Sequence, residues 1–269
     1  MNQTAEPMVL RVRAEAPPAR VMQALTTPAE MTLWLAEHAE VSLPDRYCFW
    51  GRYTPDGERP SQRLVASAAD RIRFAWTVDG VDTDVGISLE PAGDGTLLTL
   101  RQSCADPTDA GPLGQLQTFW AATLANLVDH VEDRPVLDQT DLTSPELRAE
   151  TTICASVDDV FSSLVDPEQV SAWFGFPTDI VPEVGGQYGF GTITELEEGR
   201  RLSVDYGPMG VATWELADAG GKTRLVMTQS GFAPDQTPYA AWLGAVSGLA
   251  ELRRFHEVTP WQPIWIAAQ

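Results

Sequence analysis

The chain has 269 residues and a net charge of −20, with 18 Lys and Arg against 38 Asp and Glu. Both halves are acidic, −8 up to residue 135 and −12 beyond it, so neither supplies a basic tail or stripe that could neutralise phosphates. Nucleic acid and an anionic membrane surface are therefore excluded as expected partners.

Three scattered cysteines, Cys48, Cys104 and Cys154, form no Cys-x-x-Cys motif and have no pair of histidines nearby. They indicate neither a disulfide framework nor a zinc site. No apolar run approaches 18 residues and no leader-like segment opens the chain, so a soluble cytoplasmic protein is expected. Seventeen Arg against one Lys is typical of a bacterial source.

The first elements alternate between strand and helix. Residues 8–15 alternate well enough for a strand, and Pro17-Pro18 then starts a short helix. A second helix begins with clear signals: Thr27 at the N-cap, Pro28 at N1 and Glu30 at N3 predict a capping box. This helix ends near a large aromatic residue, Trp34.

The hydrophobic period then changes to two, which predicts strands at 47–53, 71–78, 81–89 and 96–103. Asp79-Gly80 and Asp94-Gly95 are hairpin signals, so these strands are expected to be consecutive and antiparallel. Pro112 is expected to open a long helix whose apolar positions recur at a spacing of three to four residues up to Val131.

Residues 136–146 show no hydrophobic periodicity and are interpreted as a linker. The same order of elements then follows, with strands at 147–154, 187–195, 201–206, 210–216 and 224–230. Ser156 and Asp166 are expected to cap two short helices, and Thr237 with Pro238 to open the last long one.

A direct comparison of the two halves shows a repeat at an offset of 139 residues. Val21 aligns with Val160, and the frame Leu-x-x-Pro-x-x-x-x-x-Trp recurs without a gap at Leu25 and at Leu164. Further along, Tyr47-Cys-Phe49 matches Tyr188-Gly-Phe190, and Leu100-Arg-Gln-Ser103 matches Met227-Thr-Gln-Ser230. We interpret the chain as two copies of one domain, 1–135 and 147–258.

The tail, residues 259–269, has no counterpart in the first copy. Its two prolines exclude a helix, yet its two Trp and two Ile are costly to leave in water. We expect the tail to dock on one domain or between the two, with a protein-binding motif as the alternative.

A strand, two short helices, a run of antiparallel strands and a long helix describe the helix-grip fold, in which a curved sheet surrounds a long helix and leaves a cavity. At Leu25-x-x-Pro28…Trp34, Leu164-x-x-Pro167…Trp173-Phe-Gly175 and Gly185-Gly-Gln-Tyr-Gly-Phe190, the sequence resembles the activator of heat-shock-protein-90 ATPase-like branch of the SRPBCC (START-like) superfamily. The resemblance implies an α+β chain of two tandem helix-grip domains.

The first copy departs from this pattern, because Leu35-Ala-Glu37 replaces Phe-Gly and Pro44-Asp-Arg46 replaces Val-Gly-Gly. Members of the superfamily include ligand binders, stress proteins and polyketide aromatase/cyclases, so the resemblance specifies the fold far better than the function.

A cavity between sheet and helix suits an apolar or aromatic small molecule held by a few polar groups. By alternation, the expected lining of the first cavity is Trp34, Tyr47, Phe49, Phe74, Trp76, Arg101 and Trp120. The expected lining of the second is Trp173, Tyr188, Phe190, Tyr206, Trp214, Gln229 and Trp242. Any one ring can instead be simple core filling, and an error of one residue in strand register exchanges every assignment.

The candidates for catalytic chemistry are Arg52, Arg101, His38 and Tyr47. An Arg in a dry cavity would polarise a ligand carbonyl or bind a carboxylate, whereas the bland alternative is a surface Arg paired with an acid. His38 is the one histidine expected near a pocket mouth. No nucleophile elbow, phosphate-binding loop or dinucleotide fingerprint occurs, so neither a metal nor a nucleotide cofactor is indicated.

The leading hypothesis is a binding protein that holds a small hydrophobic molecule in one or both cavities, with the second copy as the expected open one. The alternatives are a cyclase-like enzyme that positions a polyketide against Tyr and Arg, and a co-chaperone-type module that binds a protein through the Trp-rich tail.

Overall fold

A computed structural model describes residues 7–104, 113–175, 177–232 and 239–266, and the side chains of 239–246 are outside the described part. The chain divides into two compact units, Met1–Thr143 with Ile264–Gln269, and Ser144–Pro263. The expected helix starts at Pro112 and at Thr237 with Pro238 lie outside the described residues.

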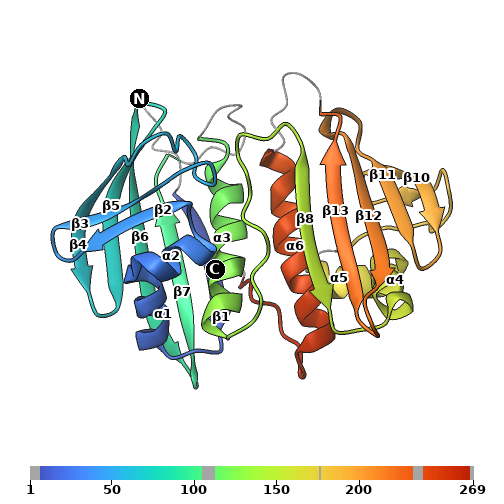
Figure 1. Cartoon of the computed structure of the whole chain (residues 1–269), viewed down its shortest axis with the longest axis horizontal. Helices are drawn as coiled ribbons and strands as arrows, with labels where there is room; N and C mark the ends of the chain where they lie inside the picture. The colour runs from blue at the N-terminus through green and yellow to red at the C-terminus, as the bar shows by residue number, and fades with distance from the viewer. Residues whose placement is uncertain (1–6, 105–112, 176, 233–238, 267–269) are drawn as a thin grey trace. The chain divides into compact units, whose positions relative to one another are not determined.

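The first unit pairs its first strand with its last. Its sheet has the strand order β1-β7-β6-β5-β4, all pairs are antiparallel, and β2 and β3 form a separate hairpin. Figure 1 shows the long helix α3 against this sheet. The elements are β1 (Met8–Ala14), α1 (Pro18–Thr26), α2 (Pro28–Trp34), β2 (His38–Ser42), β3 (Arg46–Trp50), β4 (Gln62–Ala68), β5 (Arg71–Val78), β6 (Val81–Ala92), β7 (Gly95–Gln102) and α3 (Leu116–Val131).

The second unit repeats this plan with the strand order β8-β13-β12-β11-β10-β9, again antiparallel throughout. Its elements are β8 (Leu147–Ile153), α4 (Val157–Val165), α5 (Pro167–Phe174), β9 (Gln187–Tyr188), β10 (Gly191–Glu197), β11 (Arg201–Asp205), the short 3-10 turn Gly207–Met209, β12 (Val211–Asp218), β13 (Thr223–Ser230) and α6 (Tyr239–Glu257).

The shared order of elements confirms the α+β prediction of tandem helix-grip units. The sequence did not predict β2 and β4. Most residues of β4 are exposed and only Gln62 is buried, so this edge strand shows no hydrophobic alternation for a pattern to detect.

The repeated tryptophan makes the same hydrogen bond in both units. The indole Nε1 of Trp34 donates to the carbonyl of Ala24 at 3.2 Å, and that of Trp173 donates to the carbonyl of Ser163 at 2.7 Å. Each bond spans ten residues and ties the second short helix to the end of the first. A buried indole N–H needs such an acceptor, which explains why the frame ends in Trp and not Phe.

Two further bonds recur at equivalent places. Thr96 donates to the carbonyl of Ala16 and Thr223 to that of Ala155, which joins the last strand to the chain after the first strand. At the end of each long helix a carboxylate accepts a backbone N–H that follows the first strand: Glu132 from Glu15, and Glu257 from Cys154. The two copies therefore retain the same internal bonds although few of their residues are identical.

The helix caps differ between the copies. Asp166 accepts bonds from the backbone N–H groups of Glu168 and Gln169, as its position predicts. Thr27 occupies the equivalent N-cap without a side-chain bond, so the predicted capping box in the first copy is wrong. Glu30 instead accepts hydrogen bonds from Arg20, Gln23 and His130, and these polar partners compete with the backbone for its carboxylate.

The tail docks on the first unit through an isolated β-bridge to β1. The backbone N–H of Arg13 donates to the carbonyl of Ile264 at 2.8 Å, and that of Ile266 donates to the carbonyl of Arg11 at 3.0 Å. Val12 and Trp265 form the bridge between them, and the Ile264 side chain is buried. The tail therefore covers the free edge of β1, an edge that would otherwise present unpaired backbone groups.

We expect Trp173→Phe to lower the free energy of unfolding of the second unit by about 1 kcal/mol or more, because the Ser163 carbonyl loses its donor while a ring remains. Denaturant titration monitored by circular dichroism measures this change. Trp214→Phe is the matched control, since the Trp214 indole N–H has no hydrogen-bond acceptor among the described residues. An equal loss in both variants would contradict the assigned role.

Ile266→Pro removes the N–H that donates to Arg11 and should loosen the tail from β1. The exposed edge then favours strand pairing between molecules. Light scattering after size exclusion should show a larger, concentration-dependent mass for this variant. An unchanged mass, together with unchanged amide exchange at residue 13, would show that the tail does not protect the edge.

Candidate functional site

The interior of the first unit is filled by its own rings. Phe49 is fully buried, and its ring centroid lies 5.2 Å from Trp76, 5.9 Å from Phe74 and 6.2 Å from both Phe119 and Trp120. Tyr47 lies beside Phe74 at 5.1 Å, and burial raises the pKa of its hydroxyl. The predicted lining residues therefore do lie close together, but their rings pack against one another.

A polar chain crosses this packed interior. Trp120 Nε1 donates to Gln102 Oε1 at 2.5 Å, Gln102 Nε2 donates to the Thr83 hydroxyl at 3.0 Å, and Thr83 donates to the carbonyl of Trp76. Among the described residues the Trp76 indole N–H itself has no acceptor. A hollow of about 10 Å³ beside Trp34 has room for about one water molecule.

The expectation that Arg101 faces the interior is wrong. Leu98, Leu100 and Gln102 are buried on β7, and the intervening Arg101 is exposed on the outer face. Gln102, one residue further along β7, is the inward-facing side chain that was not predicted. A signal was available, because Gln102 aligns with Gln229, which was expected to line the second cavity and is buried.

The other polar candidates of the first copy also lie outside the interior. Arg52 is exposed in the turn after β3, where its Nε lies 3.6 Å from Glu37 and its guanidinium lies 4.9 Å from the Tyr53 ring. This is the surface pairing that was kept as the alternative. His38 is exposed on β2 with its ring 5.3 Å from Trp50, not at a pocket mouth.

In the described part of the second unit, the rings of Tyr188 and Trp214 lie on the inner face of the sheet. Tyr188 is buried and donates its hydroxyl to the carbonyl of Leu164 at 2.9 Å, while its ring lies 6.1 Å from Trp214. Trp214 and Tyr206 are only half-buried. Burial raises the pKa of Tyr206, and burial together with the charge of Tyr206 raises that of Tyr188, so both hydroxyls stay protonated near neutral pH.

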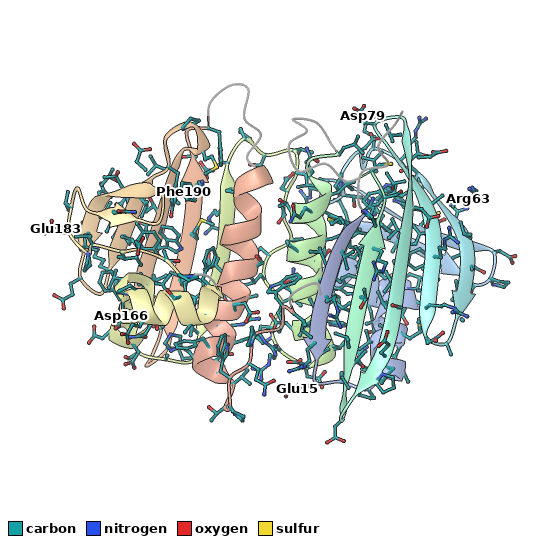
Figure 2. All side chains as sticks on the ribbon, turned by 180° about the vertical axis from the view of Figure 1, so that it is seen from behind. Glu15, Arg63, Asp79, Asp166, Glu183 and Phe190 are labelled. Carbon is teal, nitrogen blue, oxygen red and sulfur yellow. The ribbon has the colours of Figure 1, made fainter. Side chains whose placement is uncertain are left out.

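Phe190 does not line the interior as expected. It occupies the two-residue turn between β9 and β10, is 78 % exposed, and lies 5.0 Å from the Tyr206 ring. Figure 2 shows it at this turn. The next residue must be glycine, because a Cβ on Gly191 would lie 2.6 Å from Tyr206, so Tyr206 packs directly against the backbone of β10.

The remaining predicted residues of the second copy have structural partners or fall outside the description. Trp173 is held by its bond to Ser163, and Gln229 is buried and donates to the carbonyl of Met209 at 2.8 Å. The side chain of Trp242 lies outside the described residues.

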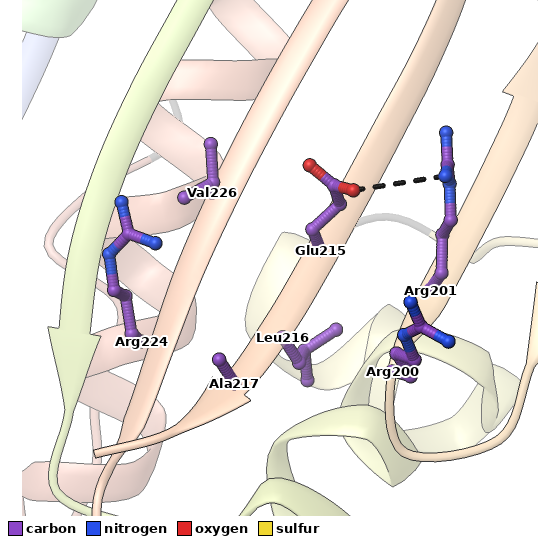
Figure 3. Close-up of a pocket in the computed structure, with 7 residues that line it drawn as sticks. All are labelled: Arg200, Arg201, Glu215, Leu216, Ala217, Arg224 and Val226. Carbon is purple, nitrogen blue, oxygen red and sulfur yellow. Dashed lines mark ion pairs between the residues drawn. The ribbon is translucent and has the colours of Figure 1, made fainter.

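A separate hollow of about 240 Å³ lies on the outer face of the second sheet (Figure 3). Its arginines are balanced by acids: Arg224 by a two-pronged bond to Glu150, Arg201 by Glu195 at 2.8 Å and Glu215 at 3.8 Å. Its lining is Arg200, Arg201, Glu215, Leu216, Ala217, Arg224 and Val226.

The described residues contain no group of three His, Cys, Asp or Glu side chains that could hold a metal ion. Every helix in the described part of the chain is too short or too polar to serve as a transmembrane span.

Two curved antiparallel sheets, each with a long helix against its inner face and a Trp-tied helix pair, define a tandem helix-grip protein of the SRPBCC type. The chain belongs to the family described as activator of Hsp90 ATPase homolog 1-like protein, whose model matches residues 15–132 and 154–253. The two matched segments fall one in each unit. No curated protein matches the chain.

Several solved structures are similar. DynU16, titled a putative protein in the dynemicin biosynthetic locus, is 18 % identical over 93 % of this chain and 99 % of its own, with a TM-score of 0.41. CalU16 from Micromonospora echinospora is 22 % identical over 48 % of this chain and 76 % of its own, with a TM-score of 0.38. The Aha1 dimer from Colwellia psychrerythraea is 17 % identical over 47 % and 96 %, with a TM-score of 0.40.

Proposed function

We propose that the second unit binds a small aromatic or hydrophobic molecule against the inner face of its sheet. The observation that carries this proposal is the contrast between two aligned phenylalanines. Phe49 of the first copy is fully buried among five other rings, whereas Phe190 of the second is 78 % exposed in a turn. The ring that fills the first interior therefore does not fill the second.

The residues left around that position suit an aromatic ligand. Trp214 on β12 and Tyr206, directly after β11, are half-buried and supply flat apolar surface for offset stacking. Neither the Tyr206 hydroxyl nor the Trp214 indole N–H has a hydrogen-bond partner in the described part of the chain, so both are available to fix the orientation of a ligand oxygen.

The protonation states support binding over acid–base catalysis. A catalytic base must titrate near the working pH, but the pKa values of Tyr188 and Tyr206 are raised from the usual tyrosine value. The Tyr188 hydroxyl is in addition already bonded to a backbone carbonyl. A cyclase-like reaction remains the alternative proposal, in which Tyr206 would hydrogen-bond a polyketide carbonyl and not remove a proton.

The test is titration of the full chain with 2-naphthol, followed by tryptophan fluorescence. We expect saturable binding that Tyr206→Phe weakens about five- to tenfold, the usual loss for one hydrogen bond in a partly buried site. Trp214→Leu should weaken binding further, because it removes the stacking surface.

Tyr47→Phe is the matched control, since it removes the corresponding kind of buried hydroxyl from the first unit. This variant should bind 2-naphthol with unchanged affinity. Equal losses for Tyr47→Phe and Tyr206→Phe, or no saturable binding by the unmodified chain, would refute the assignment to the second unit.

A further inference from the structure

The outer face of the first sheet gathers arginines that are dispersed in the sequence. Strand register places Arg101, Gly86 and Arg73 side by side on β7, β6 and β5. The next row along the same face contains Arg11, Thr99, Ser88 and Arg71, from β1 to β5. We call these two rows the arginine face.

Three arginines of this face are exposed and Arg11 is half-buried, and the face holds fewer acids than arginines. Arg71 and Arg73 are 72 % and 58 % exposed. Arg73 forms a close ion pair with Asp84, and the Nε of Arg71 lies 3.9 Å from Asp70. In the described part of the chain the guanidinium groups of Arg11 and Arg101 have no partner. Flanking charges on the next row, Arg13 and Glu90, cancel each other. The face is therefore positive on a chain whose net charge is −20.

The second unit provides an internal comparison at the same register positions. When corresponding strands of the two sheets are matched through their pairing registers, Arg11 corresponds to Glu150, Arg73 to Ser203 and Arg101 to Thr228. In the same way Ser88 corresponds to Glu215, and Arg71 corresponds to Arg201. Arg201 is paired with two glutamates, Glu195 and Glu215. Among the described residues, the first copy thus leaves Arg11 and Arg101 without an acidic partner, whereas Arg201 of the second copy is paired with two glutamates.

We propose that the arginine face of the first unit docks an extended acidic segment of a partner protein. Arg71 and Arg73 are two residues apart on one strand, about 6.7 Å, and alternate carboxylates of an extended peptide have the same spacing. Arg101 and Arg73 lie on either side of Gly86, so their backbones are two strand spacings, about 9.5 Å, apart. A Cβ built on Gly86 would meet nothing within 4 Å, so a peptide can approach the sheet between them.

Acidic side chains fit this face better than nucleic acid does. The four arginines span only three strand spacings, about 14 Å, and the net charge of −20 on the chain repels a dense polyanion. A carboxylate accepts two parallel hydrogen bonds from a guanidinium, and the hydroxyls of Ser88 and Thr99 lie in the row between Arg11 and Arg71 to donate further bonds.

The test uses fluorescein-labelled deca-glutamate and the full chain, with fluorescence anisotropy at 20 mM and at 150 mM NaCl. We expect binding at low salt that weakens at the higher salt, because these charges are exposed. Arg71→Gln should weaken binding about two- to fivefold, as expected for one exposed charge pair. The combined change of Arg71, Arg73 and Arg101 to Gln should weaken it more than tenfold.

Two matched variants separate this face from general electrostatics. Arg201→Gln changes the aligned arginine of the second unit and should leave affinity within about twofold of the unmodified chain. Ser88→Glu introduces the acid that the second copy carries at the aligned position and should abolish binding. Equal effects of Arg71→Gln and Arg201→Gln would overturn the proposal.

Three other results would overturn it as well. No binding of deca-glutamate at 20 mM NaCl would remove the surface as an acidic-peptide site. Tighter binding of a single-stranded DNA decamer would assign the face to nucleic acid. Concentration-dependent self-association that Ser88→Glu abolishes would assign it to a second copy of this chain. A failure of 2-naphthol binding leaves this proposal intact. That ligand is expected on the inner face of the second sheet, whereas the arginine face is the outer face of the first.

Discussion

A buried indole N–H must reach an acceptor, and in both halves of this chain the same backbone carbonyl, ten residues earlier, supplies it. This bond closes the pair of short helices and places a tryptophan against the core behind them, where Trp34 is fully buried and Trp173 nearly so. The sheet and the long helix are in turn joined by the Glu132 and Glu257 bonds to the chain after the first strand. With these ties retained, the remaining positions of each copy were able to diverge without loss of the fold.

The divergence is greatest where the chain enters the sheet after the helix pair. In the first copy β2 and β3 form a hairpin that brings Phe49 into a cluster of five aromatic rings. In the second copy β9 is two residues long and a Gly-Phe turn follows it, so the aligned ring stays at the surface. A filled interior stabilises one unit, whereas the half-buried rings of the other are the feature that a ligand-binding role requires.

The repeat frame, the hairpin signals and the period-two alternation were enough to predict two helix-grip units, because these patterns depend on local geometry and on burial. They did not settle which residue of an alternating pair faces inward, and Arg101 was chosen where Gln102 is the buried residue. The position of Phe190 depends on a two-residue turn that no hydrophobic pattern marks. Composition also excluded a basic surface, but Arg11, Arg71, Arg73 and Arg101 meet only through strand pairing, which a residue count cannot detect.

The pairing of residues 264–266 with β1 has a consequence for how the protein is made. The chain leaves the first unit near residue 143, builds the whole second unit, and only then returns to complete the edge of the first sheet. During synthesis from the N-terminus, β1 stays without its outer neighbour for about 120 further residues, or roughly 6 to 24 s at ordinary rates of elongation. In a cell the first sheet to fold is therefore the last to be closed, and its open edge is a site where chaperones or neighbouring nascent chains can act.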